Sequence, residues 1–245
     1  MQFKREYFIG AREIGINNKL TNYGILAFLE DIAGIHSDNV GYGVKDVAEK
    51  KKAWILMDWK LQVIKRAGFG EKIIVKTWAK TMSKPQFYTY RDFEVYNEKE
   101  ELIAIATSKW VFLDIEKERI SKIDLEVLKL YNPDDKRVFG IEEIEKINIP
   151  DNFENVTEYQ VKRFDIDVNR HMHNLNYINL AYEALPEEVY NTQEFDNVRV
   201  SYKHQIKLGD NVKCYYSKSN EVHTVVIKNE DESVIHAIVE LKWRS

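Results

Sequence analysis

The most concentrated group of polar side chains in the 245-residue chain lies in residues 165–174. This segment reads Asp-Ile-Asp-Val-Asn-Arg-His-Met-His-Asn, so that Asp167, Asn169 and His171 occupy alternate positions. In an extended or turning segment, this spacing lets the three side chains point to one side. A histidine can then serve as a general base while a carboxylate or an amide fixes its tautomer. The segment is therefore a candidate for acid–base chemistry at a carbonyl group.

A helix is predicted directly after this segment, over residues 174–184. Its apolar residues recur at the spacing of one helix face: Leu175, Ile178, Tyr182 and Leu185. A helix N-terminus exposes unpaired N–H groups, which can hold a carbonyl oxygen as it becomes an oxyanion. One such donor in a preorganised site contributes about 2.7–4 kcal/mol. In the alternative interpretation, the aspartate and asparagine side chains only cap the helix and form turns, and spacing alone does not separate the two.

The other reactive side chains are expected to be structural. A metal site at His171 and His173 is disfavoured, because two-residue spacing is poor on a helix and no further ligand cluster is evident. No metal or cofactor is therefore predicted. Cys214 lies in a predicted strand without an acid–base partner next to it, and we expect a small core residue there. As the single cysteine, it excludes an intrachain disulfide.

The first half of the chain reads as one long helix followed by long strands. A helix is predicted over residues 21–40, which Thr21 or Asn22 can cap and Gly41 or Gly43 can end. Four stretches of alternating or dense apolar residues are predicted as strands: 55–63, 72–79, 87–96 and 102–113. Long antiparallel strands after one helix favour an α+β unit, in which a curved sheet wraps around the helix.

The second half repeats this plan. Around the helix at 174–184, five stretches are predicted as strands: 157–162, 197–206, 212–217, 222–228 and 234–243. The turn Gly70-Glu71 matches Gly209-Asp210, so two copies of one unit would form a pseudo-dimer in a single chain.

The boundaries follow from where strand patterning stops. We expect an N-terminal domain at residues 1–123, a charged linker at 124–156 and a C-terminal domain at 157–245. Short helices are predicted inside the linker at 125–130 and 141–147.

The segment at 167–178 resembles a sequence of the acyl-(acyl carrier protein) thioesterases of plants and bacteria. It reads Asp-Val-Asn-Arg-His-Met-His-Asn-Leu-Asn-Tyr-Ile, close to the family pattern DVNQHVNNxxYI. Further similar blocks follow the family's order: Trp54 onward, Gly70-Glu71, Val-Lys-Thr-Trp at 75–78, Ala-Thr-Ser-Lys-Trp-Val-Phe at 106–112 and Arg-Ile-Ser-Lys-Ile at 119–123. The resemblance implies two tandem hot-dog domains, each a long helix wrapped by a curved antiparallel sheet. It implies hydrolysis of fatty acyl-(acyl carrier protein), which releases free fatty acid and ends fatty acid synthesis.

The resemblance also assigns the catalytic residues to the second domain. Asp167, Asn169 and His171 match the family motif directly. The family's glutamate, in the pattern Y-R-R-E-C, corresponds to Gln205, and the cysteine after it corresponds to Ile206. A glutamine cannot act as a base, but it can hold a water or a carbonyl group.

These matches give a mechanistic hypothesis. His171 assists the attack of water on the thioester, Asp167 orients His171 or positions the helix start, and Gln205 helps to place the water. Asn169 and backbone N–H groups at the helix N-terminus hold the oxyanion. His204 is expected to lie on the strand face opposite Gln205, as a partly buried strand residue.

The first domain is implied to shape an apolar pocket for the acyl chain. The candidates for this pocket are Ile25, Leu29, Ile32, Met57, Trp59 and Trp78. For each of them, an ordinary core role is the alternative. The implied partner, acyl carrier protein, is strongly acidic, so a basic docking patch is expected. Four cations lie near the predicted site in sequence: Arg163, Arg170, Lys203 and Lys207.

Composition narrows the remaining classes of protein. The net charge of −4 disfavours broad nucleic-acid binding, and no apolar run approaches the roughly 20 residues of a membrane span. The first residues carry no apolar signal core, so a cytoplasmic location is expected. A homodimer is compatible with the sequence.

Three other functions remain open on this evidence. The same fold could carry an acyl-coenzyme A thioesterase or a 3-hydroxyacyl-thioester dehydratase. The presence of Gln205 in place of a glutamate also allows an acyl-binding protein without catalysis.

Overall fold

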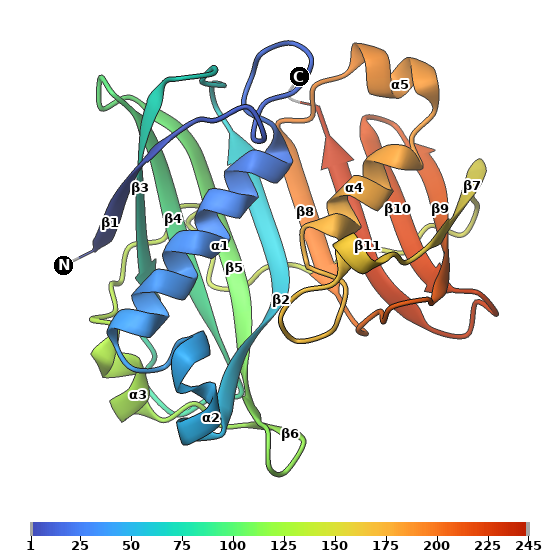
Figure 1. The fold of residues 1–245 in the computed structure, drawn as a ribbon. Coiled ribbons are helices and arrows are strands. Elements are labelled where there is room, and N and C mark those ends of the chain that lie inside the picture. Colours follow the sequence, from blue (N-terminus) through green and yellow to red (C-terminus); the bar gives the residue numbers. More distant parts are fainter. Residues whose placement is uncertain (1, 244–245) are drawn as a thin grey trace. The chain divides into compact units, whose positions relative to one another are not determined.

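The computed structural model describes residues 2–243. The chain divides into two compact units, Met1–Ile144 and Glu145–Ser245. Each unit contains one main helix and an antiparallel sheet, which confirms the α+β class (Figure 1).

The N-terminal unit packs helix α1 (Asn22–Asn39) against a sheet in the order β1-β3-β4-β5-β2, with β6 paired to β5. Its strands are β1 (Phe3–Phe8), β2 (Lys52–Val63), β3 (Lys72–Ala79), β4 (Tyr88–Asn97), β5 (Leu102–Asp114) and β6 (Arg119–Ser121). The short helices are η1 (Val44–Asp46), α2 (Val47–Lys50) and α3 (Leu125–Leu130). Helix α1 lies against β1 and β3, and all strand pairs are antiparallel (Figure 1).

Local signals set the ends of α1 as predicted. The Thr21 hydroxyl accepts the N–H of Gly24 at 2.9 Å, which satisfies one of the unpaired donors of the first turn. Gly41 follows the last turn with φ of 76°, the left-handed conformation that ends many helices. Residues at the two ends of α1, Thr21 and Gly41, therefore set where this helix begins and ends.

Apolar residues at alternate positions in β2, among them Ile55, Met57 and Trp59, predict that these side chains share one face, and this prediction is wrong before residue 57. A β-bulge at Met57 shifts the pairing with β5, and an extra residue inverts which side chains face the core. Before the bulge, the Trp54 indole donates to the Tyr131 hydroxyl at 2.8 Å, and that hydroxyl donates to a serine of α1. Trp54 thus faces α1 and Ile55 faces away, whereas Trp59 keeps the predicted side.

The segment at 132–144 lies across the face of β3 and β4 that points away from α1. The Trp78 indole donates to the carbonyl of Lys136 at 3.1 Å, and the Asp92 carboxylate accepts the N–H of Val138 at 3.1 Å. Of the two predicted linker helices, the first is confirmed by α3. The second, at 141–147, is wrong, because the segment has no helix there and the carbonyl of Ile141 accepts from Lys80 instead.

The C-terminal unit packs helix α4 (Asn176–Glu183) against a sheet in the order β8-β11-β10-β9-β7. The strands are β7 (Asn155–Gln160), β8 (Asn197–Tyr202), β9 (Asn211–Ser219), β10 (Val222–Asn229) and β11 (Ile235–Lys242). The short helices are η2 (Arg163–Asp165) and α5 (Glu187–Thr192). Helix α4 lies against β9, β10 and β11 (Figure 1). The helix-and-sheet plan therefore occurs in both units, as the sequence repeat predicts.

Strand β8 ends four residues earlier than predicted. The N–H groups of Lys203 and His204 both donate to the carbonyl of His236, at 2.8 and 3.2 Å, so the ladder of hydrogen bonds stops there. His204 and Gln205 are exposed in the loop that follows. The expectation of a partly buried His204 on a strand face is therefore wrong, since alternation does not apply outside a strand.

Candidate active site

The predicted catalytic motif forms a tight turn at residues 166–172. An isolated bridge between Ile166 and Met172 closes it. Inside the bridge, the N–H of Asp167 donates to the carbonyl of His171 at 2.8 Å. Arg170 takes the left-handed conformation, with φ of 63°, where the chain reverses. The turn places the main chains of Asp167 and His171 opposite each other.

The Asp167 carboxylate is bound to the backbone of this turn. One of its oxygens accepts the N–H of Asn169 at 2.8 Å and that of His171 at 3.2 Å. Its other oxygen accepts the Asn169 side-chain amide at 3.2 Å. Asp167 therefore binds the main chain of His171, and within residues 2–243 no hydrogen bond joins its carboxylate to the imidazole ring.

The imidazole of His171 is half-buried. Among residues 2–243, no side chain hydrogen-bonds this ring. The position of the ring is thus set by the main-chain contacts of the turn.

Gln205 lies on a loop that is bonded to the motif turn. The N–H of Met172 donates to the carbonyl of Ile206 at 2.8 Å, which brings the residue after His171 beside the residue after Gln205. The buried Tyr177 hydroxyl also contacts the backbone of Ile206, and burial raises its pKa. The structure therefore places the backbone of the Gln205 loop beside the turn that carries Asp167, Asn169 and His171.

His236 supports the Gln205 loop from β11, and the sequence analysis did not identify it. Burial lowers the pKa of His236, which keeps the ring neutral. Its Nδ1 lies 3.2 Å from the carbonyl of His204 and, as a neutral ring nitrogen that carries hydrogen, donates to it. The side chain and the carbonyl of His236 thus both bind the loop that positions Gln205.

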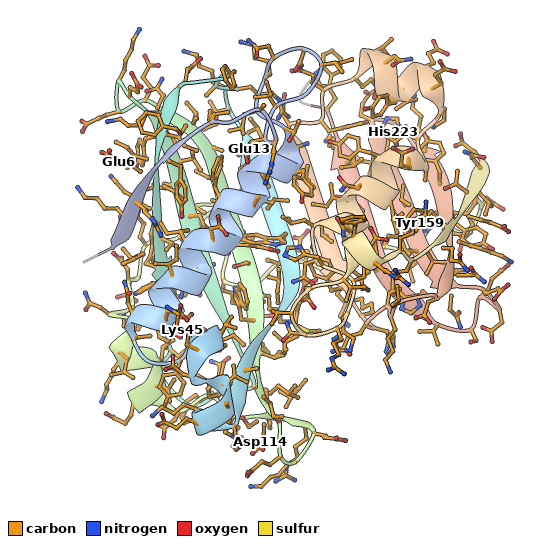
Figure 2. All side chains as sticks on the ribbon, viewed as in Figure 1. Glu6, Glu13, Lys45, Asp114, Tyr159 and His223 are labelled. Carbon is orange, nitrogen blue, oxygen red and sulfur yellow. The ribbon has the colours of Figure 1, made fainter. Side chains whose placement is uncertain are left out.

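Tyr159 and Asp165 fix the other side of the turn. The Tyr159 hydroxyl, on β7 (labelled in Figure 2), donates to the Asp165 carboxylate at 2.8 Å. The same carboxylate accepts the N–H of Lys162 at 2.7 Å, and the Asp165 carbonyl accepts the N–H of His173 at 2.7 Å. A strand tyrosine carries no local signal for this contact, so the sequence analysis missed it.

The start of α4 offers fewer donors than predicted. The helix begins at Asn176, and Leu175, Asn176 and Tyr177 already donate their N–H groups to residues 173 and 174. In the run 171–178, the N–H of Asn174 is the one amide without an acceptor among the described residues. The predicted oxyanion site therefore narrows to this amide and to the second N–H of the Asn169 side chain.

The candidate acyl-pocket residues do not share one surface. Ile25, Leu29 and Ile32 of α1 are buried against the sheet, and Trp59 packs on Phe93 at 5.2 Å between ring centres. Trp78 lies on the opposite sheet face, under the segment at 132–144, since its neighbour Thr77 points toward α1. Met57 is half-buried in the β-bulge.

A buried polar pair also lies beneath α1. The Arg91 guanidinium contacts Nδ1 of His36 at 3.0 Å and the Thr77 hydroxyl at 3.2 Å. Burial, followed by the charge of Arg91, lowers the pKa of His36 to about 3, so the imidazole is neutral and accepts from Arg91. The predicted apolar core therefore contains a charged group that periodicity did not reveal.

Two further expectations concern metal and thiol chemistry. Among residues 2–243, no group of three or more histidine, cysteine, aspartate or glutamate side chains has the arrangement of a metal site. Cys214 is buried, and burial raises the pKa of its thiol to about 12, which confirms it as a core residue.

Two domain models of one known protein family match this chain, one in each half. The acyl-ACP thioesterase N-terminal domain matches residues 1–131, and the acyl-ACP thioesterase C-terminal domain matches residues 149–245. The chain belongs to the acyl-ACP thioesterase family. Within residues 2–243, no helix combines the length and the apolar character needed to cross a bilayer.

Two curated relatives of this acyl-ACP thioesterase family member come from plants. The chain is 24% identical over 245 residues to an oleoyl-acyl carrier protein thioesterase of Coriandrum sativum, covering 93% of this chain and 66% of the relative. It is 24% identical over 223 residues to a palmitoyl-acyl carrier protein thioesterase of Cuphea hookeriana, covering 83% and 51%. The chain thus spans about half to two thirds of the length of these relatives. Both relatives are named as chloroplastic.

Solved structures confirm the predicted fold for this family member. An acyl-ACP thioesterase from Bacteroides thetaiotaomicron superposes with a TM-score of 0.88 at 21% identity, covering 99% of this chain and 98% of the other. A 12:0-ACP thioesterase from Umbellularia californica gives a TM-score of 0.83 at 16% identity, covering 99% and 97%. The prediction of two hot-dog domains in one chain is therefore confirmed.

Proposed function

We propose that this protein hydrolyses the thioester of fatty acyl-(acyl carrier protein) and releases free fatty acid. The observation that carries the proposal is the hydrogen bond of Met172 to Ile206, which joins the His171 turn to the Gln205 loop. Family membership and the names of the relatives support the substrate class. Release of the fatty acid from its carrier would end fatty acid synthesis.

The arrangement supports general-base hydrolysis. His171 takes a proton from water, and the water oxygen attacks the thioester carbonyl carbon. The oxyanion that forms is held by the N–H of Asn174 and by the Asn169 amide. When the carbon–sulfur bond breaks, His171 returns the proton to the leaving thiolate. The products are then the free acid and the carrier thiol, with no cofactor required.

Gln205 has a positioning role in this scheme. Its amide carries both a donor and an acceptor, so its oxygen can accept the second hydrogen of the attacking water. An amide does not take up a proton near neutral pH, which leaves His171 as the base. The loop contacts of His236 fix the Gln205 backbone within reach of the turn.

The acyl chain is proposed to enter the helix-facing core of the N-terminal unit. The best candidates for contact with it are Ile25, Leu29, Ile32 and Trp59, which are buried on that side of the sheet. Met57 stays a weaker candidate at the bulge. Trp78 is excluded from this pocket, because its indole lies on the sheet face that points away from α1.

The test is a panel of acyl carrier protein thioesters of varied chain length, scored for free fatty acid and carrier thiol. Replacement of His171 by Ala is expected to lower kcat by about 10²–10⁴-fold, as for loss of a general base. Near-normal turnover by this variant would refute the assignment. The variant Gln205→Ala should lower kcat with little change in KM, since it displaces water and does not remove a group that binds the acyl chain.

The competing functions are separate outcomes of this panel. Faster turnover of acyl-coenzyme A would identify that donor as the substrate. An enoyl product without free thiol would indicate a dehydratase. Tight acyl binding without hydrolysis, together with turnover in Gln205→Glu, would indicate an acyl-binding protein.

Location and assembly stay predictions. The expectation of a cytoplasmic location would be tested by fractionation of the native host. The expectation of a homodimer would be tested by light scattering on the purified chain.

A further inference from the structure

Three segments of the C-terminal unit form the surface around the His171 turn: residues 161–165, 166–173 and 203–210. Three backbone hydrogen bonds join them, from His173 to Asp165 at 2.7 Å, from Met172 to Ile206 at 2.8 Å and from Val161 to Asp210 at 2.9 Å. We call this surface the basic rim. The rim lies within one unit, and main-chain hydrogen bonds join its three segments. The backbone positions of its residues are therefore fixed relative to one another.

The basic rim is positively charged in a chain whose net charge is −4. Five exposed cations lie on it: Lys162, Arg163, Arg170, Lys203 and Lys207. None of the five forms an ion pair with another described residue. Its three carboxylates each accept a backbone N–H inside a turn: Asp165 from Lys162, Asp167 from Asn169 and Asp210 from Lys207. The acids are therefore turned into the loops, while the cations stay in solvent.

The same segments expose large apolar side chains. Phe164 is 100% exposed, Val168 is 77% exposed and Leu208 is 55% exposed. Val168 lies inside the catalytic turn, and Phe164 and Leu208 each adjoin a cation of the rim. Exposure of a phenyl ring to water is unfavourable, and burial of the ring against a partner would relieve it. Apolar side chains among unpaired charges are typical of a protein interface, in which the apolar groups are buried at the centre.

We propose that the basic rim is the docking surface for the acyl carrier protein. This inference rests on the proposed function, which makes that strongly acidic protein the donor of the thioester. Complementary charge would steer the carrier toward the rim, and burial of Phe164 and Val168 would hold it there. Because Val168 and His171 share one turn, a carrier on the rim delivers its thioester to the catalytic histidine.

Other anionic occupants fit the rim less well. The phosphates of coenzyme A would neutralise cations but offer no protein surface to cover Phe164. An anionic membrane would use both kinds of side chain, but it would not present a thioester at His171. The carrier protein accounts for the charge, the exposed apolar groups and the position beside the turn together.

The test compares two donors that carry the same acyl chain, one on acyl carrier protein and one on coenzyme A. The docking variants are Arg163→Glu combined with Lys207→Glu, and Phe164→Ser. Matched controls are Lys242→Glu, an exposed cation at the other end of β11 from His236, and Phe69→Ser, a 58% exposed phenyl ring in a turn of the N-terminal unit. The Arg163 carbonyl accepts the N–H of Ile166 at 3.4 Å, a main-chain contact that Arg163→Glu keeps. No side chain changed in these variants forms a hydrogen bond to residues 166–172 among the described residues.

Both docking variants are expected to raise KM for the carrier-bound donor by about tenfold or more, with kcat within about twofold. Raised salt should increase the same KM for the unmodified protein, since exposed charges are screened. KM for the coenzyme A donor should stay unchanged in every variant, and both controls should behave as the unmodified protein.

Several results would overturn the inference. Equal effects on both donors would assign the rim to a small phosphate ligand. Unchanged carrier KM, with loss of binding to anionic phospholipid vesicles in Phe164→Ser, would assign it to a membrane surface. If the unmodified protein hydrolyses neither donor, the proposed function fails, yet docking is still measured as the Kd of holo acyl carrier protein by fluorescence anisotropy. Equal Kd for docking and control variants would then refute the docking surface by itself.

Discussion

Two hydrogen bonds join Asp167 and His171, one between their main chains and one from the His171 main chain to the Asp167 carboxylate. The N–H of Asp167 donates to the carbonyl of His171 at 2.8 Å, and the N–H of His171 donates to the Asp167 carboxylate at 3.2 Å. This reciprocal pair fixes the main chain of His171, the proposed base, and within residues 2–243 it includes no hydrogen bond to the imidazole ring. In the proposed mechanism, Asp167 therefore fixes the geometry of the turn, and His171 is the base.

The Asp167 contacts predict a difference between two substitutions. Asp167→Asn keeps an oxygen that accepts both N–H groups, so kcat should fall less than about tenfold. Asp167→Ala removes that acceptor and should lower kcat about 10- to 100-fold through displacement of His171. Steady-state kinetics on the carrier-bound donor would measure both. Equal losses in the two variants would show that the charge of Asp167 is required and would contradict this assignment.

His36 predicts how stability depends on pH. Three side chains face its imidazole: Arg91 at 3.0 Å, the stacked ring of Phe3 and the edge of Tyr131. Its native pKa of about 3 lies below the value of 6.5 that it regains on unfolding. The unfolded state therefore binds a proton that the native state refuses, so stability is full above pH 6.5 and falls as pH drops toward 3.

Urea unfolding at pH 7.5 and pH 4.5 would test this dependence. In His36→Gln, whose amide oxygen can still accept from Arg91, the loss of stability between the two values should be smaller than in the unmodified protein. The control His204→Gln changes an exposed histidine and should keep the full loss. Parallel pH dependence in all three proteins would exclude a contribution from His36.

Lys80 and Asp92 form a buried ion pair under the segment at 132–144. Their charged atoms lie 3.5 Å apart, and both side chains are buried. Lys80→Met would leave the Asp92 carboxylate buried without its cation, which should cost about 3–5 kcal/mol of unfolding free energy. Addition of Asp92→Leu should recover part of this loss. The exposed Lys84→Met serves as control and should change the free energy by less than about 0.5 kcal/mol.

Cys214 predicts resistance to thiol reagents. With a pKa of about 12, its thiol is almost entirely protonated at pH 8, and its side chain is buried in β9. Treatment of the folded protein with iodoacetamide should therefore leave fatty acid release unchanged, as should Cys214→Ala at a temperature where the variant is folded. Rapid inactivation by the reagent, with protection by substrate, would show that the thiol takes part in the reaction.

The sequence determined the features whose signals are local. The cap at Thr21 and the left-handed Gly41 lie within one turn of the helix ends they set, so a few residues suffice to predict α1. The motif turn is equally local, because the Asp167 carboxylate binds residues two and four positions ahead. Repetition of the helix-and-sheet plan predicted the two units and their fold.

Only the tertiary structure decided which distant segments meet. The bulge at Met57 depends on pairing with β5, and it changed the face of every earlier side chain in β2. His236 supports Gln205 from a strand 31 positions later, and Tyr159 binds Asp165 across a loop. Periodicity reports which side of an element is apolar, but the partner on that side is set by packing of the whole unit. Spacing in the sequence therefore named His171 and the family resemblance named Gln205, whereas the fold decided what holds each of them in place.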